Sequence, residues 1–186
     1  PVMEKNIPIH VRGTNNPEDP GTVIGSEYEQ DCPVRGIAGK SGFVQIDVRK
    51  NMMNTEVGFG ARLFDIFAHY DCSYDHSPTQ IDSIAVLIHE NQLEGKERAI
   101  LSDIERKLDP ESINVKRGLS LISVVGEELP YHPDIQARIM GHLADNGIKI
   151  EVNGHGSDQI SMTMGVSNED YDSAVRAIYN GVFEQG

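Results

Sequence analysis

The residues with the clearest chemical potential are a short polar loop, two glycines and one aspartate. The loop is Met53-Asn-Thr-Glu-Val-Gly58, and apolar spacing predicts a helix that starts near Phe59. Free backbone N–H groups and the positive dipole end of a helix attract anions, and Gly58 and Gly60 would let a ligand approach the backbone closely. Asp75 follows on an adjoining predicted strand and could accept a hydrogen bond from an ammonium group. Glycines in such a short motif, taken alone, more often only close a tight turn.

Motifs of familiar catalytic and metal sites are missing from the sequence. It has no phosphate-binding P-loop, no His-Glu-x-x-His, no Cys-x-x-Cys pair and no Gly-x-Ser-x-Gly. The seven histidines are scattered, and His76 and His155 lie among glycine, proline or serine, as loop or strand-end residues do. Cys32 and Cys72 form no disulfide framework, which favours a reduced, cytoplasmic protein. We therefore expect no catalytic residue, cofactor or metal ion.

Charge and composition exclude further classes of partner. The 186 residues include 29 acidic and 16 basic side chains, for a net charge of −13. Nucleic acids and anionic membrane surfaces both require basic patches, so neither is expected as a partner. A hydrophobic content of 38% is enough for a folded core, yet no stretch approaches the ~20 apolar residues of a membrane span. The chain should form one domain or two small ones.

An internal repeat at an offset of 76 positions organises the chain. Ala61-Arg62 recurs as Ala137-Arg138, and apolar positions of the flanking helix keep the same register. The repeat runs without a gap from about Phe43 to Ile88, and its apolar spacing predicts strand, helix, strand, strand and helix. In the first copy the predicted strands are 43–48, 74–77, 84–88 and 113–115, and the helices are 59–70 and 96–108. In the second copy the strands are 121–125, 148–152 and 160–164, and the helices are 134–144 and 169–182.

The second copy has no fourth strand of its own, since the chain ends with its last helix. Residues 34–38 form a spare strand before the first copy, and we predict that they complete the second sheet. The fold class is therefore α+β, with two ferredoxin-like βαββαβ modules, the first inserted into the second. The predicted boundaries are 43–117 for the first module and 31–42 plus 118–186 for the second. Residues 1–30 contain too few apolar side chains for a core and form a tail or linker.

Several segments together resemble the aspartate kinase family. Ile7–Ile24 is similar to the end of the catalytic domain of these enzymes. Gly58-Phe-Gly-Ala-Arg-Leu-Phe64 and Ser73-Tyr-Asp75 resemble their first ACT regulatory module. Leu121-Ile-Ser-Val-Val-Gly126 and Gly154-His-Gly-Ser157 resemble the second. The similarity covers nearly the whole chain in family order, and the amino-terminal ATP and aspartate domain is absent from it.

This resemblance implies an allosteric region rather than an enzyme. In the family, tandem ACT modules bind end-product amino acids of lysine, threonine and methionine biosynthesis, inhibit the kinase, and form dimers. The expected effector is lysine, with threonine as the alternative. ATP and Mg²⁺ would bind only in the missing catalytic domain. Two other functions stay open, namely a stand-alone amino acid sensor and a structural dimerisation module that binds no ligand.

The resemblance also selects the candidate effector-binding residues. Family members use the loop, the helix start and the following strand, often with the partner's strand across the dimer. The corresponding positions here are Met53, Asn54, Thr55, Glu56, Gly58, Phe59, Gly60, Ala61, Tyr74, Asp75 and Ser77.

The second copy should bind an effector less well. At the same offset Pro130 replaces Asn54 and Pro133 replaces Val57, and each proline removes an N–H donor. Asp134 replaces Gly58, and its carboxylate could cap the helix and occupy the position where the carboxylate of an effector would bind. We expect this module to have a structural or dimerising role.

Overall fold

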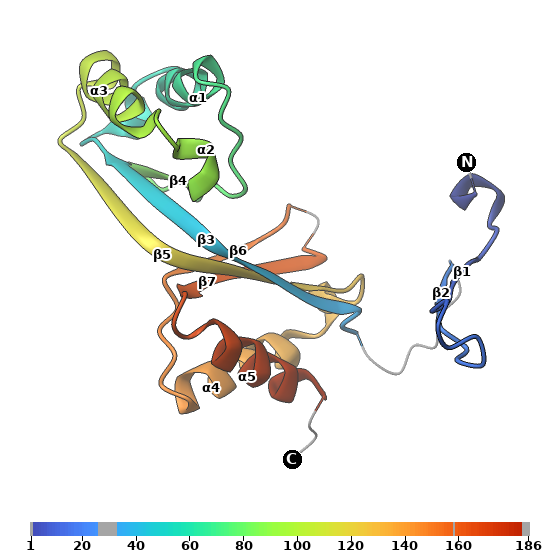
Figure 1. The fold of residues 1–186 in the computed structure, drawn as a ribbon. Coiled ribbons are helices and arrows are strands. Elements are labelled where there is room, and N and C mark those ends of the chain that lie inside the picture. The colour runs from blue at the N-terminus through green and yellow to red at the C-terminus, as the bar shows by residue number, and fades with distance from the viewer. Residues whose placement is uncertain (1, 26–32, 158, 184–186) are drawn as a thin grey trace. The chain divides into compact units, whose positions relative to one another are not determined.

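The computed structural model describes residues 2–25, 33–157 and 159–183, which form two separate units (Figure 1). The first unit reaches residue 33 and contains a short 3-10 helix, η1 (Met3–Lys5). Its two strands, β1 (Ile9–Val11) and β2 (Thr22–Ile24), pair as an antiparallel hairpin in which every strand residue is exposed. The boundary predicted between residues 30 and 31, like Cys32, lies outside the described residues.

The second unit, from residue 34 onward, is built on one antiparallel five-stranded sheet. The strand order is β4-β3-β5-β7-β6. Strands β3 (Gly36–Arg49) and β5 (Ser112–Val125) are each 14 residues long and pair along their whole length. Figure 1 shows both strands running from a pair of helices, α1 and α3, to a second pair, α4 and α5. The two modules therefore share a continuous sheet, with helices covering each half.

The first module uses the carboxyl half of β3 and the amino half of β5. Between them come η2 (Met53–Thr55), α1 (Phe59–His69), β4 (Ser83–His89), α2 (Glu90–Leu93) and α3 (Glu97–Leu108). One face of each helix is apolar, and these faces pack on the sheet because alternate strand residues point toward them. The core includes Ile46, Val86, Leu63, Ile100 and Ile104, none of which exposes any surface.

The second module uses the remaining halves of the same strands. It adds η3 (Leu129–Tyr131), α4 (Pro133–Asp145), β6 (Val152–His155), β7 (Ser161–Ser167) and α5 (Tyr171–Phe183). Residues 36–41 pair with residues 120–125, as predicted for the spare strand. Ile139 of α4 and Ile178 of α5 are fully buried, at positions that the apolar spacing had marked for the core. The α+β, ferredoxin-like class with an inserted first module is therefore confirmed, while the numbered module boundaries stay predictions.

Four predicted strands turn out to be halves of two. The sequence suggested that 34–38 and 43–48 were separate, as were 113–115 and 121–125, but each pair belongs to one strand. The register between β3 and β5 shifts near Gly42 and Gly118, whose φ values are +88° and +70°. Bulges of this kind bend a strand without ending it, and glycine adopts a positive φ at little cost.

Two other strand predictions need correction. Residues 74–77 form no regular strand: His76 makes an isolated bridge with Leu87, and Thr79, beyond this segment, makes another with Ile84. Pro78 lies between these bridges and lacks an N–H, so it cannot continue a ladder. The strand predicted at 148–152 begins only at Val152, because the Ile148 N–H returns to the Leu143 carbonyl and closes the end of α4.

Candidate functional site

The loop that precedes α1 is held in place by the turn before β4. The Met52 N–H donates to Asp82 Oδ1 at 3.0 Å, and the Asn54 N–H donates to the Ile81 carbonyl at 3.2 Å. Thr55 Oγ1 donates to the Met52 carbonyl at 2.8 Å, so its hydroxyl serves the loop itself. Met53 is buried in the core, as methionine commonly is. The loop is thus a fixed structure whose outer surface faces solvent.

The start of α1 presents unsatisfied backbone donors. Gly58 is the N-cap residue with φ 79°, and no side chain caps the helix. Among the described residues, the N–H groups of Gly60 and Ala61 have no hydrogen-bond acceptor. Phe59 is buried and anchors the helix, while Val57 just before it is 93% exposed. The arrangement leaves two amides and a helix dipole open to a small anion.

Glu56 on this loop already has two cationic partners. Its carboxylate pairs with Lys50 at 3.0 Å and also with Arg62. Arg62 Nη1 in addition donates to the Val57 carbonyl at 3.1 Å. Glu56 is therefore occupied by the protein's own cations, and a ligand ammonium would have to compete with both.

The strand-side candidates lie along β4 rather than around the loop. Tyr74 stacks on Phe64 of α1 with ring centroids 4.9 Å apart. Ser77 Oγ donates to the Ala85 carbonyl at 2.7 Å, and the Asp75 N–H donates to the Leu87 carbonyl at 2.9 Å. The loop, by contrast, contacts residues 81 and 82. Eight of the eleven candidates thus lie in the loop and the helix start, Asp75 and Ser77 lie beside the middle of β4, and Tyr74 contacts α1 through Phe64.

Asp75 lines a cavity of about 310 Å³ on the sheet face away from the helices. Lys40, Phe43 and Leu121 also line it, with the hydroxyls of Ser123 and Thr163, which hydrogen bond to each other at 2.9 Å. The Asp75 carboxylate is exposed and has no ion-pair partner among the described residues. The carboxylate is therefore not neutralised by a cation of the described residues, and its role as an ammonium partner stays a prediction.

His76 also lines this cavity and joins the two modules. Its Nε2 is buried and has no hydrogen-bond partner among the described residues. A Cβ added to Gly154 of β6 would lie 2.8 Å from this nitrogen, so the ring packs directly on the β6 backbone. Burial lowers the pKa of His76 below its ordinary value and so favours the neutral ring.

The matching positions of the second module carry different groups, although the Asp134 N–H also lacks an acceptor among the described residues. Pro133 begins α4 and has no N–H. The prediction that Asp134 caps this helix is wrong, because no side chain caps α4. Asp134 lies within the first turn, and its carboxylate approaches Arg138 at 3.4 Å and His132 at 3.8 Å instead.

Three contacts near the loop were missed by reasoning from the sequence. Lys50 and Arg62 pair with Glu56, and Asp82 holds the Met52 amide. The i, i+6 spacing of Glu56 and Arg62 falls outside the helix rule that flags ion pairs. The contact of Asp82 depends on tertiary structure, because 30 residues separate it from Met52.

The part of the chain that the structure describes contains no cluster of three or more potential metal ligands. Within the same residues, no helix is long and apolar enough to cross a membrane.

Comparisons with known proteins agree in pointing to one family. A model of the ACT domain matches residues 122–181. Aspartokinase 3 of Bacillus subtilis is 34% identical over 185 residues, covering 98% of this chain and 41% of that protein. The crystal structure of aspartate kinase from Clostridium acetobutylicum matches with a TM-score of 0.91 and 33% identity, over 97% of this chain and 42% of that one.

A more distant structure shares the fold. E. coli aspartokinase III, in complex with lysine and aspartate, matches with a TM-score of 0.79 at 20% identity, over 98% of this chain and 40% of that one. This chain spans about two fifths of the length of these three relatives.

Proposed function

Because this chain is a regulatory ACT region of the aspartokinase family, we propose that it binds an end-product amino acid and feedback-inhibits the phosphorylation of aspartate. The catalytic domain is not in this chain, so the region acts on a kinase that binds ATP, Mg²⁺ and aspartate elsewhere. In this proposal the protein works in the cytoplasm, in lysine, threonine and methionine biosynthesis.

The observation that carries the proposal is the open start of α1. The N–H groups of Gly60 and Ala61 lack acceptors among the described residues, and Gly58 lets a ligand come close. The effector carboxylate binds there, where partial positive charge is greatest. The neighbouring cations Lys50 and Arg62 strengthen the attraction for a carboxylate.

The effector ammonium needs a partner from the candidates beside the middle of β4. Asp75 lies beside the middle of β4, away from the loop contacts at residues 81 and 82. We propose that a homodimer through the first modules brings the partner's strand segment to the helix start, so that each site uses both chains. This arrangement would bring the candidates beside β4 to those at the helix start.

Lysine is the favoured effector because its second ammonium demands a second carboxylate. Asp75 has no ion-pair partner among the described residues, and Asp82 uses one oxygen for the Met52 amide. E. coli aspartokinase III, which shares this fold, was crystallised with lysine. Threonine, the alternative, would need only a small pocket and a hydroxyl partner.

Isothermal calorimetry with L-lysine and L-threonine, separately and together, tests the proposal. We expect saturable heat with lysine at about one site per chain, and loss of that heat in Asp75→Ala. Binding of threonine alone would change the effector and keep the regulatory function. The absence of binding heat with both amino acids would favour a structural module. Lysine binding that is unchanged by Asp75→Ala would exclude the role of that carboxylate.

A further inference from the structure

Strand β5 has one free edge along the first module. On one side residues 112–116 pair with β3. On the other side β7 pairs with β5 only from Leu119 onward, so residues 112–117 have no strand partner there among the described residues. Free edges are templates for pairing with another chain, and proteins usually shorten, cover or charge them.

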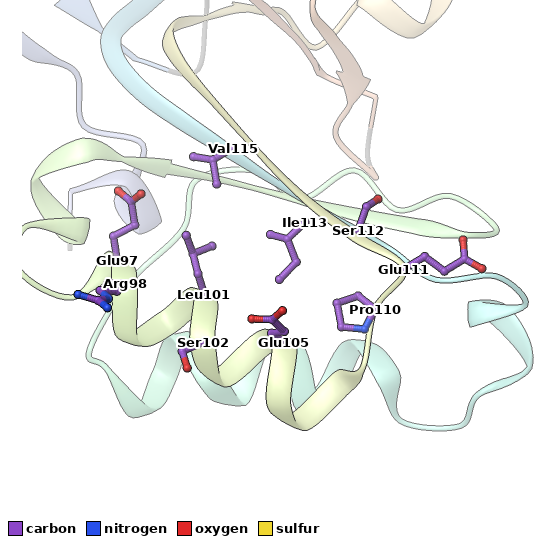
Figure 2. A pocket seen from close by; sticks show the side chains of 10 residues that line it. All are labelled: Glu97, Arg98, Leu101, Ser102, Glu105, Pro110, Glu111, Ser112, Ile113 and Val115. Carbon is purple, nitrogen blue, oxygen red and sulfur yellow. The ribbon is translucent and has the colours of Figure 1, made fainter.

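An open groove follows this edge, between β5 and α3 (Figure 2). Its volume is about 960 Å³. Figure 2 shows Ile113 and Val115 of β5 and Leu101 of α3 directed into the space between the two elements. All three are only partly buried, although they pack against the core of the first module. An added strand would therefore gain apolar contacts as well as backbone hydrogen bonds.

The sequence of the edge is complementary to itself when read in the opposite direction. Residues 111–117 are Glu-Ser-Ile-Asn-Val-Lys-Arg, with Asn114 at the centre. In an antiparallel pair of two copies centred on Asn114, Ile113 would face Val115 of the other copy. Glu111 would likewise face Arg117 of the other copy. Each contact occurs twice by symmetry, and opposite charges and β-branched pairs across strands are favourable.

The side chains of the edge have the orientation that this pairing needs. Val115 is opposite Ile46 and Ile113 opposite Val48 on β3, so both β5 residues point to the helix-covered face. Arg117 pairs with Glu97 of α3, which places it on the same face. Asn114 is opposite Asp47 and points to the other face, away from the groove.

We propose that this edge binds the same edge of a second copy of the chain, antiparallel and centred on Asn114. The interface joins two five-stranded sheets into one and places the two α3 grooves side by side. It is distinct from the dimer proposed above, which uses the 74–77 segment beside β4, at the opposite edge of the first module. Two different symmetric interfaces in one chain build assemblies larger than a dimer.

Reversal of the paired charges gives the first test, by sedimentation velocity over a range of protein concentrations. Glu111→Arg and Arg117→Glu should each weaken this association on the order of tenfold or more, because each places like charges opposite one another twice. The double variant Glu111→Arg/Arg117→Glu should restore it. Glu105→Arg changes a groove charge outside the pairing and is the matched control. Circular dichroism checks that each variant is folded.

Cross-linking gives the second test, and it reads the register directly. Asn114→Cys places two thiols opposite each other at the symmetry axis, so mild oxidation should yield a covalent dimer. Ser112→Cys, on the same strand and face, would place its thiols about 13 Å apart, at ~3.3 Å per residue, and should not cross-link. The parent chain with its native cysteines is the background control.

Equal assembly of all charge variants, with no cross-link from Asn114→Cys above background, would overturn the proposal. Efficient cross-linking from Ser112→Cys but not from Asn114→Cys would overturn the register and with it the charge pairing. The sedimentation and cross-linking results do not depend on effector binding. A failure of lysine to bind in calorimetry would therefore leave this proposal untouched.

Discussion

The two modules share a fold but differ at the junction where a loop enters the first helix. In the first module Gly58 precedes α1, and the amides beyond it are open. In the second, Pro133 starts α4 without an N–H, and Asp134 places a carboxylate in the first turn, beside its own open N–H. Two modules with the same fold can therefore have different functions when a few residues at the helix start differ, even though their core positions are equivalent.

The acidic positions that follow the first helices differ in the same way. Asp75 has no ion-pair partner among the described residues, whereas Glu151, 76 positions later, pairs with Lys116 at 2.5 Å and with Lys149 at 3.1 Å. The hydrogen bond from Lys116, opposed by partial burial and supported by Lys149, lowers the pKa of Glu151. Ligand chemistry is expected where the protein leaves its own charged and polar groups unsatisfied.

The largest effects should come from core positions that the two modules share. Leu63 and Ile139 are equivalent under the repeat and both are fully buried. Leu63→Ala and Ile139→Ala should each lower the free energy of unfolding by about 2–5 kcal/mol, measured by urea denaturation. Asp65→Ala on the exposed side of α1 is the control. A loss well below 1 kcal/mol in only one variant would show that the two cores are not equivalent.

Making the first junction resemble the second should weaken effector binding. Gly58→Asp introduces the second module's residue at a φ of 79° and should cost on the order of 1 kcal/mol of stability. Its carboxylate would repel the effector carboxylate, so we expect lysine affinity to fall at least tenfold in calorimetry.

Gly95→Asp is the matched control for this change. Gly95 also has a positive φ, of 70°, and an added Cβ would meet open space. This variant should lose a similar amount of stability and keep its affinity for lysine. Equal affinity in Gly58→Asp and Gly95→Asp would contradict an anion site at the start of α1.

A smaller effect is expected from the ion pairs of the loop. Glu56→Gln removes the carboxylate shared by Lys50 and Arg62, all of which are partly exposed. The free energy of unfolding should fall by at most about 1 kcal/mol at low salt, and the difference should shrink in 1 M salt because solvent screens such pairs. Glu105→Gln, which has no ion pair among the described residues, is the control. A loss of unfolding free energy that is the same at low and high salt would indicate that Glu56 stabilises the loop by packing rather than by its charge.

The smallest effect should be a pH dependence of stability that comes from His76, on the sheet face away from the helices. Burial lowers the pKa of His76, so folding favours its neutral form. The stability associated with the neutral ring is fully present above the pKa of histidine in the unfolded chain, about 6.5. It is lost as the pH falls through the lower pKa that the ring has in the folded chain. Asp75 and Lys40 line the same cavity, and the ring packs on Gly154.

His76→Gln isolates this contribution in urea denaturation between pH 7.5 and 5. We expect the wild-type chain to lose more stability than the variant over this range. The second module has Val152 at the equivalent position, so it offers no such titration. Parallel pH profiles for the two proteins would exclude His76 as the source.

Sequence periodicity predicted the helices well because their burial follows a simple rule. The spacing that includes Leu63 and Ile66 marked α1, and both residues are buried. Strand continuity was not predictable, because Gly42 and Gly118 look like loop residues until the paired register shows them to be bulges. The separation of Asp75 from the loop was also hidden, since it depends on tertiary contacts: the Asp75 N–H donates to Leu87 of β4, whereas the loop contacts residues 81 and 82 before that strand.

The insertion of one module in the other has a consequence for the order of folding. Residues 36–41 can pair with residues 120–125 only by closing a loop that contains the whole first module. An unfolded loop of that length carries a large entropic cost, which falls once its ends are already close. Formation of the first module brings Phe43 and Leu119 together and so removes most of that cost. The inner module is therefore expected to fold first and act as the nucleus for the outer one, so that a defect in it delays both.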